Sequence, residues 1–146
     1  MEIPLVLISV FDEARRLGTK TNLKRGFTVP IERIQTGPRM SQAVIHNHTV
    51  YLAGQVASGA PGGSVAEQTK DILSKIDALL SEAQTDKSKI LSATIWLTDM
   101  STFSEMNAVW EAWVVPIATP ARATVASPHL ASPDFNVEIA ITAALS

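Results

Sequence analysis

Two charged side chains stand alone in apolar stretches near the C-terminus. Arg122 lies in the run Ala121–Val125, and Glu138 lies in the run Val137–Ile141. Both runs read as β-strands, whose successive side chains point to opposite faces, so Arg122 and Thr124 share one face. A lone charge is costly to bury without a partner, and one interpretation is a structural ion pair between the two residues. A guanidinium also matches a planar carboxylate, and a carboxylate can accept a proton from water, so the alternative is a functional site.

The composition indicates one domain with a substantial core. The chain has 146 residues, of which 46% are hydrophobic and 18% are charged, and its formal net charge is -2. This acidic balance argues against a general nucleic-acid binder, which needs clustered Lys and Arg. The chain has no cysteine, which excludes disulfides, thiolate nucleophiles and cysteine metal sites. No apolar run approaches the length that spans a bilayer, so we expect a cytoplasmic protein with no membrane partner.

The first 30 residues differ in character from the rest. Gly18 and Pro30 punctuate them, and the apolar start Ile3–Phe11 is short and lacks a basic region before it. Such a start is a poor secretory signal. Basic residues follow, although early acidic residues count against organellar import, which stays as an alternative. We therefore predict an N-terminal extension over residues 1–30 and one domain over residues 31–146.

The periodicity after residue 30 predicts an α+β domain with the element order β-β-β-α-β-α-β-β. The first four strands are expected at Ile31–Gln35, Ser41–Asn47, Thr49–Val56 and Ile90–Thr98, and the last two hold Arg122 and Glu138. Capping boxes at Ser64–Glu67 and Thr102–Glu105 are predicted to begin the two helices. Gly54 interrupts the third strand, where a glycine often marks a bulge or a close backbone approach.

The two amphipathic helices can cover only one face of this sheet. In the fourth strand, alternation predicts that the covered face carries Leu91, Ala93, Ile95 and Leu97. The other face is expected to carry Ser92, Thr94, Trp96, Arg122, Thr124 and Glu138. A monomer would expose this broad, half-apolar surface, and such surfaces usually mark contacts. We therefore expect self-association through this face, with clefts between subunits lined by Arg122 and Glu138.

Several short motifs occur in a fixed order through residues 31–146. They are Gly37-Pro38, Ser41–Val44, Tyr51–Gln55, Met106-Asn107, Pro120–Val125 and Val137–Ile139. This ordered set resembles the RidA family of reactive imine/enamine deaminases, also called YjgF-like proteins. The resemblance implies a chorismate-mutase-like β-sheet with two helices packed on one face, assembled as a homotrimer with clefts between its subunits.

The same resemblance implies a hydrolase of the 2-iminobutanoate/2-iminopropanoate deaminase type. Such an enzyme converts reactive 2-imino acids, tautomers of enamines such as 2-aminoacrylate, to 2-keto acids and ammonia and so prevents metabolite damage. The enamines come from pyridoxal-phosphate dehydratases, which would be functional partners, and the protein itself would need no cofactor. By resemblance Arg122 binds the substrate carboxylate, Glu138 orients and deprotonates the attacking water, and main-chain groups at Gly54 and Thr124 complete the pocket.

One stretch departs from the family pattern. Where the family commonly has a tyrosine after Gly-Pro, this chain has Arg39-Met40, with one extra residue. A tyrosine that would line the cleft is therefore missing, which leaves the substrate range open. Met40 takes its place in the substrate pocket, and Arg39 could add a second carboxylate contact.

Other interpretations of these residues stay open. The cleft could bind a small carboxylate without turning it over. Some relatives are labelled RNA-cleaving translation inhibitors, but this chain lacks a basic, aromatic-rich stripe. The three histidines, His46, His48 and His129, have no ligand-like spacing with carboxylates, so no metal site is predicted. Asn107 is expected to have a structural role, bonding main chain at a turn or a subunit contact.

Overall fold

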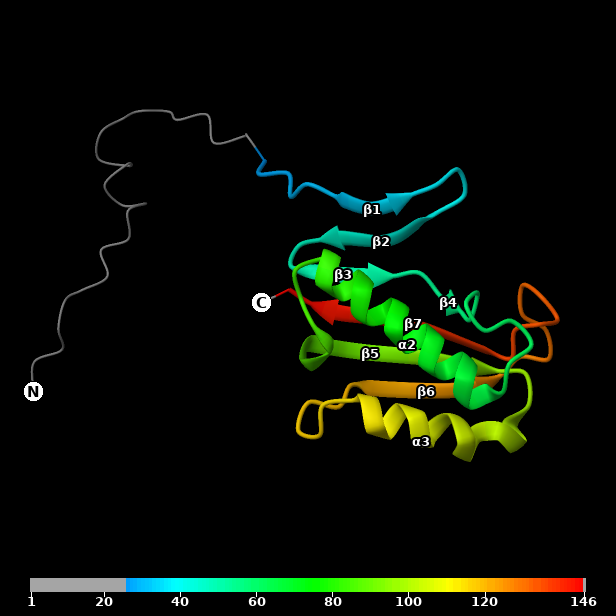
Figure 1. Ribbon diagram of the computed structural model, residues 1–146. Coiled ribbons are helices and arrows are strands. Elements are labelled where there is room, and N and C mark those ends of the chain that lie inside the picture. The colour runs from blue at the N-terminus through cyan, green and yellow to red at the C-terminus, as the bar shows by residue number, and fades with distance from the viewer. Residues whose placement is uncertain (1–25, 146) are drawn as a thin grey trace, which may run out of the picture.

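The computed structural model describes residues 26–145, so most of the expected N-terminal extension lies outside the described part. The elements in chain order are β1 (Glu32–Thr36), β2 (Ser41–His46), β3 (Thr49–Leu52), β4 (Gln55–Val56), α2 (Val65–Glu82), η1 (Lys87–Lys89), β5 (Ile90–Leu97), η2 (Met100–Thr102), α3 (Phe103–Trp113), β6 (Ala121–Ala126) and β7 (Val137–Ala144) (Figure 1). The two η elements are single 3₁₀ turns. Within the described residues, no helix is long and apolar enough to cross a membrane.

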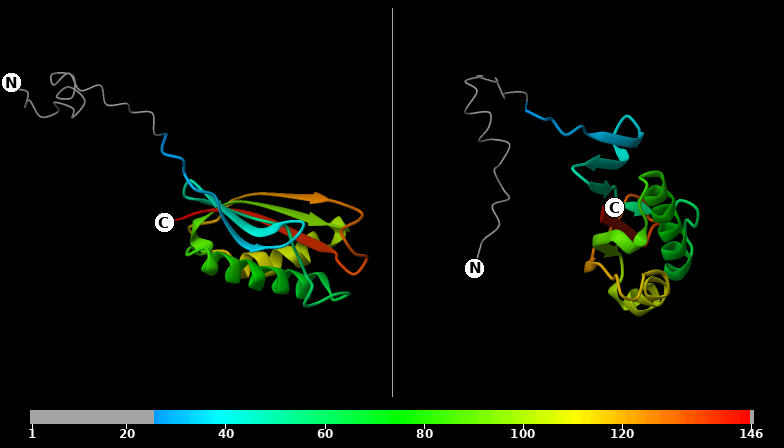
Figure 2. Two further views of the ribbon diagram at one scale, coloured as in Figure 1. Left: turned by 90° about the horizontal axis from the view of Figure 1, so that it is seen from above. Right: turned by 90° about the vertical axis from the view of Figure 1, so that its left-hand side faces the viewer.

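The strands form one sheet in the order β1-β2-β3-β7-β5-β6, and β4 pairs separately with β7. All pairings are antiparallel except that of β5 with β6, which is parallel. Both helices lie on the same face of the sheet, and no helix from residues 26–145 lies over the opposite face (Figure 2). The predicted α+β class and the packing of two helices on one face are therefore confirmed.

The hydrophobic core lies between α2 and the middle of the sheet. One apolar face of α2 and its C-cap residue are buried throughout, with Ile72, Leu73, Ile76, Leu79, Leu80 and Ala83 all at most 4% exposed. It packs with the inward side chains of β7, namely Val137, Ile139, Ile141 and Ala143. Each large aliphatic side chain buried in this way contributes about 1.5–3 kcal/mol. The spacing in the sequence therefore gives β7 a fixed inner face, and Glu138 must point the other way.

A bulge divides the third predicted strand into β3 and β4. Tyr51 pairs with Thr142, whereas Gln55 pairs with Ile139, so this strand has one more residue than β7 between the two pairs. The extra residue falls at Ala53-Gly54, which lies between the end of β3 and the start of β4. The interruption predicted at Gly54 is therefore confirmed, and it lies beside β7.

The first predicted capping box is present at the start of α2. Ser64 Oγ accepts a hydrogen bond from the Glu67 N–H, and a Glu67 carboxylate oxygen accepts one from the Ser64 N–H. Hydrogen bonds from the backbone and the side chain of Ser64 lower the pKa of the Glu67 carboxyl, and the bond from the backbone is the largest cause. The box satisfies two donors that a helix start otherwise leaves unpaired.

The second predicted capping box is wrong. Thr102 makes no side-chain cap at α3 and instead donates from Oγ1 to the Asp99 carbonyl in the preceding 3₁₀ turn. Glu105, its expected partner, accepts a hydrogen bond from the Ala66 N–H in the first turn of α2. A local sequence pattern could not reveal this because Glu105 caps the other helix.

The predicted face of Leu91 is also wrong. Ile90 pairs with Ala143 and Ser92 with Thr142, so β5 contains a bulge at Leu91. The bulge turns Leu91 outward, where it is 51% exposed, and Ile90 enters the core instead. Beyond the bulge, alternation holds as predicted from Ala93 to Leu97.

Candidate functional site

The pairing of β6 with β5 places Arg122 on the face of the sheet that the helices cover. Arg122 pairs with Ala93 and Thr124 pairs with Ile95, and both partners are buried in the core. Paired residues of neighbouring strands point to the same face. The expectation that Arg122 and Thr124 lie on the uncovered face is therefore wrong. Alternation within β6 correctly puts these two residues on one face, but only the pairing with β5 decides which face it is.

Helix α3 holds the guanidinium of Arg122. Arg122 Nη1 donates a hydrogen bond of 2.8 Å to Asn107 Oδ1. Arg122 Cζ lies 5.8 Å from the ring centre of Phe103 and 5.5 Å from that of Trp110, within the range of a cation–π contact. The side chain remains exposed in the single chain, so it is ordered yet open to a ligand. Within the described chain, Asn107 Oδ1 accepts from this side chain rather than from main chain, and the predicted bond at a subunit contact stays a prediction.

Thr124 adds an unpaired hydroxyl near the same place. Its Oγ1 is buried and has no hydrogen-bond partner among the described residues. A buried hydroxyl without a partner is costly and rare in native structures. This atom therefore has the capacity to bond a ligand or a second copy of the chain. The predicted contribution of the Thr124 main chain stays a prediction.

Glu138 lies on the uncovered face of the sheet. It pairs with Trp96 of β5 and with Val56 of β4, while its neighbours Val137 and Ile139 are fully buried on the other face. Glu138 is partly buried, and this desolvation raises the pKa of its carboxyl. Desolvation disfavours the charged form, and a carboxylate with a raised pKa is a stronger base.

The bulge glycine gives Glu138 its position. A Cβ atom added at Gly54 would overlap Oε1 of Glu138 and would lie 3.0 Å from its Cδ. Only a residue without a side chain lets the carboxylate lie against the backbone here. The close approach predicted at Gly54 is therefore present, and the group that approaches is the Glu138 side chain.

One pocket of about 360 Å³ brings together three of the predicted site residues, Met40, Gly54 and Glu138. Its other lining residues are Gln42, Gln55, Val56, Ser58, Lys75 and Ala131. Arg39 is exposed and does not line this pocket, so its expected carboxylate contact stays a prediction. Lys75 lines the pocket and was not predicted, because a lysine on the polar side of a helix gives no signal in the sequence.

The ammonium of Lys75 is occupied within the chain. Lys75 Nζ donates to the Val56 carbonyl at 2.7 Å and lies 3.2 Å from an Asp71 carboxylate oxygen. It also donates to Ser58 Oγ. These contacts join α2 to β4 and to the loop after it, so Lys75 supports one wall of the pocket.

Arg122 and Glu138 do not meet within one chain. They point to opposite faces of the sheet, and the ion pair found among residues 26–145 joins Lys75 to Asp71. The interpretation of an ion pair between Arg122 and Glu138 within one chain is therefore wrong. Instead the chain carries two half-sites. The arginine half-site consists of Phe103, Asn107, Trp110, Arg122 and Thr124, and the glutamate half-site consists of Met40, Gly54 and Glu138.

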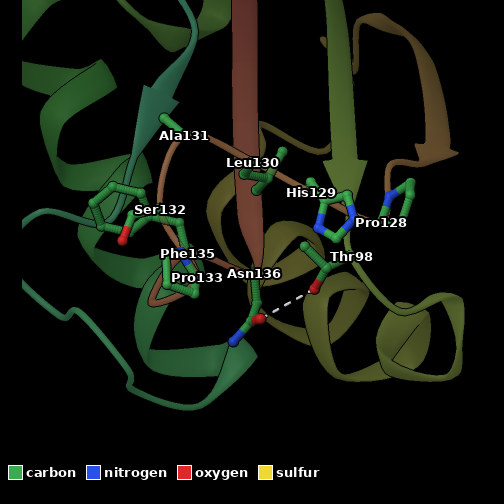
Figure 3. Close-up of a pocket in the computed structure, with 9 residues that line it drawn as sticks. All are labelled: Thr98, Pro128, His129, Leu130, Ala131, Ser132, Pro133, Phe135 and Asn136. Atoms are coloured by element: carbon green, nitrogen blue, oxygen red, sulfur yellow. Dashed lines mark hydrogen bonds between the residues drawn. The ribbon is translucent and has the colours of Figure 1, made fainter.

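The loop between β6 and β7 forms a second pocket of about 380 Å³, with His129 and Asn136 in its lining (Figure 3). Gln68 of α2, which is fully buried, fixes this loop. Its Nε2 donates to the Asp134 carbonyl, and its Oε1 accepts from the Asn136 N–H. Thr98 Oγ1 donates to Asn136 Oδ1 at 3.0 Å, the bond dashed in Figure 3. Because Asn136 directly precedes β7, these bonds fix the start of the strand that carries Glu138.

The described residues contain no cluster of three or more histidine, cysteine, aspartate or glutamate side chains that could hold a metal ion. The two half-sites carry one guanidinium, one carboxylate and nearby hydroxyl, amide and main-chain groups. These groups suit a small carboxylate ligand and a proton transfer.

The mixed sheet, with two helices on one face and two separate polar half-sites, places the chain in a class of small α+β proteins. Similarity to known proteins shows the family. The profile of the family described as Endoribonuclease L-PSP matches residues 30–145. A RutC family protein of Haemophilus ducreyi is 42% identical over 116 residues, which cover 80% of this chain and 97% of the relative. The crystal structure of a YjgF family member from Neisseria meningitidis is 44% identical, with a TM-score of 0.77 over 81% of this chain and 97% of that one. The chain belongs to the RidA (YjgF-like) family.

One more distant relative has a name that states an activity. A protein of Bos taurus named 2-iminobutanoate/2-iminopropanoate deaminase is 39% identical over 89 residues, which cover 57% of this chain and 64% of that protein. The more similar RutC family proteins have names that state no reaction.

Proposed function

We propose that this protein is a homotrimeric hydrolase that converts reactive 2-imino acids to 2-keto acids and ammonia. Each catalytic site would join the arginine half-site of one copy to the glutamate half-site of another. The observation that carries this proposal is the position of Arg122 and Glu138 on opposite faces of one sheet, each accessible but neither reaching the other. A second copy is the economical source of the missing half, because a cyclic oligomer repeats the same contact between each pair of neighbours.

The uncovered face of the sheet supports self-association. In the single chain, Tyr51 is 51% exposed and Val125 is 42% exposed on this face, where Trp96 is partly buried. Small residues such as Thr94 and Ala140 lie between them and would allow close approach of another sheet. A contiguous surface of this kind usually marks a protein contact. The edge strand β6, which carries Arg122, borders the same face.

In the proposed reaction, the N–H groups of Arg122 that Asn107 leaves free bind the planar carboxylate of the imino acid with two parallel hydrogen bonds. Glu138 accepts a proton from a water molecule as its oxygen bonds to the imine carbon. Glu138 returns this proton to the imine nitrogen, which gives a carbinolamine. It then takes the carbinolamine hydroxyl proton and passes it to the amino group as the C–N bond breaks, so that the 2-keto acid and ammonia leave. The imine is already electrophilic, so orientation and proton transfer suffice.

The raised pKa of Glu138 fits this role. A carboxylate that is partly desolvated accepts a proton from water more readily than one in bulk solvent, and it returns the proton to nitrogen in the next step. The name of the bovine relative gives this substrate class, and its similarity to part of this chain supports the same reaction here.

A coupled assay tests the proposal. A pyridoxal-phosphate threonine or serine dehydratase is mixed with its amino acid, and 2-keto acid formation is followed with and without this protein. We expect the protein to accelerate the conversion of imine to keto acid above the rate in buffer. Arg122→Ala should abolish the acceleration, whereas Lys70→Ala, on the outer surface between the helices, should not. The absence of acceleration by the wild type, or full activity in Arg122→Ala, would contradict the proposal.

A small-carboxylate binding protein without catalysis is the second candidate. The hydrogen bond between Arg122 and Asn107 of α3 favours this candidate, because it positions the guanidinium without any contribution from Glu138. In that case Arg122→Ala would lose ligand binding, Glu138→Gln would keep it, and neither the wild type nor the variants would accelerate imine hydrolysis. The RNA-cleaving activity in the family's description is less well supported here, because the chain has a net charge of -2 and no basic stripe.

A further inference from the structure

We infer that Asn107, together with the rings of Phe103 and Trp110, is a positioning device that fixes the plane and the free edge of the Arg122 guanidinium. This inference rests on the proposed function and goes beyond it, since it assigns a role to three residues of α3 that do not themselves react. We call these three residues the guanidinium holder. Asn107 is its polar member and Phe103 and Trp110 are its aromatic members.

The holder is built on one face of α3. Its residues are spaced by four and then three positions along the helix, so they lie on one side of it, facing β6. The hydrogen bond of 2.8 Å from Arg122 Nη1 fixes one corner of the planar group, and the rings at 5.8 Å and 5.5 Å from Cζ limit its rotation. Trp110 is only 5% exposed, so at least one wall of the holder is rigid.

The hydrogen bond to Asn107 uses one N–H of Nη1. A guanidinium has five N–H groups, and no other partner of Arg122 is found among residues 26–145. The edge formed by Nε and Nη2 is therefore free of hydrogen bonds within the described chain, and it can offer two parallel hydrogen bonds to one carboxylate. The holder thus orients the guanidinium and leaves this edge available to the ligand.

The neutrality of Asn107 matters as much as its hydrogen bond. An aspartate in its place would also accept from Nη1, but it would neutralise the guanidinium and compete with the ligand for it. In this chain the amide orders Arg122 and leaves its positive charge available to an anion. An arginine that is ordered before binding also loses less side-chain entropy when the ligand arrives.

The test measures binding of 2-oxobutanoate, a stable planar 2-keto acid, to the full chain by calorimetry, together with turnover in the dehydratase-coupled assay. For Asn107→Ala we expect binding to weaken by about tenfold, as for loss of a hydrogen bond to a charged group. The KM for the imine should rise by a similar factor with a smaller change in kcat, because Glu138 and the attacking water are untouched.

Asn107→Asp separates positioning from a structural role. If Asn107 only supported the fold, the aspartate, which keeps the shape and the acceptor, would be milder than alanine. We expect the reverse for ligand binding: Asn107→Asp should keep the wild-type melting temperature yet bind 2-oxobutanoate more weakly than Asn107→Ala. Phe103→Leu should weaken binding several-fold, whereas Ala112→Ser, at an exposed position on the opposite side of the same helix, should not.

The outcomes distinguish this inference from the proposed function. Normal turnover that depends on Arg122 but not on Asn107 would overturn the holder and leave the deaminase proposal intact. Binding of 2-oxobutanoate that depends on Asn107, without any turnover, would support the holder and contradict the deaminase proposal. Wild-type protein that binds no keto acid, or Asn107→Asp that binds as well as wild type, would overturn the inference.

Discussion

Arg122 and Glu138 owe their chemical character to their surroundings. Arg122 has a neutral hydrogen-bond partner in Asn107 and so keeps a net charge to offer to an anion. Glu138 lies partly desolvated beside Gly54, and this raises the pKa of its carboxyl. In the proposed reaction, these effects favour carboxylate binding by Arg122 and proton acceptance by Glu138.

Removal of the proposed base should stop the reaction without loss of the fold. Glu138→Gln keeps the size of the side chain but cannot accept a proton, so the imine-hydrolysis rate should fall by about 100-fold or more. Binding of 2-oxobutanoate should change much less, since Arg122 provides that contact. The coupled assay and calorimetry measure the two effects, and wild-type turnover by this variant would exclude Glu138 as the base.

The same substitution should change how stability depends on pH. Because the pKa of Glu138 is raised in the folded chain, that chain binds the proton more tightly than the unfolded chain, and stability falls as pH rises through the interval from the ordinary to the raised pKa. Glutamine lacks this charge, so Glu138→Gln should be more stable than wild type at pH 7, with the gain disappearing below the ordinary carboxyl pKa. Denaturant titrations at equal protein concentration test this, and a loss of stability at pH 7 would contradict it.

Gly54 should be needed for activity and much less for folding. In Gly54→Ala the new Cβ would displace the Glu138 carboxylate, whose flexible end can move aside at a cost of about 1–3 kcal/mol. We expect at least a tenfold loss of turnover with the fold retained. Gly37→Ala is the control, because the nearest atom to its Cβ would be the Met40 carbonyl oxygen at 3.5 Å. Equal activity of both variants would mean that the position of Glu138 is unimportant.

Among the helices and strands, the features that depend on residues nearby along the chain were predicted correctly. The buried stripe of α2, the Ser64–Glu67 box and the bulge at Gly54 all follow from local spacing or from one residue type. The predictions for the second capping box and for Leu91 were wrong because contacts with a distant element determine both features. Glu105 caps α2 rather than its own helix, and pairing with β7 places the bulge at Leu91.

The capping box of α2 gives a prediction at this scale. Ser64→Ala should reduce the free energy of unfolding by about 1 kcal/mol, because it leaves the Glu67 N–H without its acceptor at the helix start. Ser74→Ala, an exposed position in the middle of α2, is the matched control and should not destabilise. Denaturant unfolding measures both changes, and equal stability of the two variants would show that the box contributes nothing.

For the molecule as a whole, the roles of the site residues stay predictions, and their arrangement in space could not be predicted from the sequence. Resemblance to the family suggested Arg122, Glu138 and Gly54, and Met40 stands where the family commonly has a tyrosine; the structure places Met40, Gly54 and Glu138 in the lining of one pocket. The face of Arg122 depends on the parallel register of β6 on β5, a long-range pairing that alternation within a strand cannot reveal. That register separates Arg122 from Glu138 and makes an oligomer necessary for the proposed reaction.

Complementation between two inactive variants tests this division of the site most directly. Chains carrying Arg122→Ala and chains carrying Glu138→Gln are each inactive in the proposal, because every site in either homotrimer lacks one group. Co-expressed in equal amounts, they should form mixed trimers in which about one quarter of the sites join an intact Arg122 to an intact Glu138 from another copy.

The measurement is the rate of 2-keto acid formation by the purified mixed oligomer. We predict that this rate reaches about one quarter of the wild-type rate, while each variant alone stays near the rate in buffer. A mixed oligomer no more active than its two parent variants would contradict a site shared between copies.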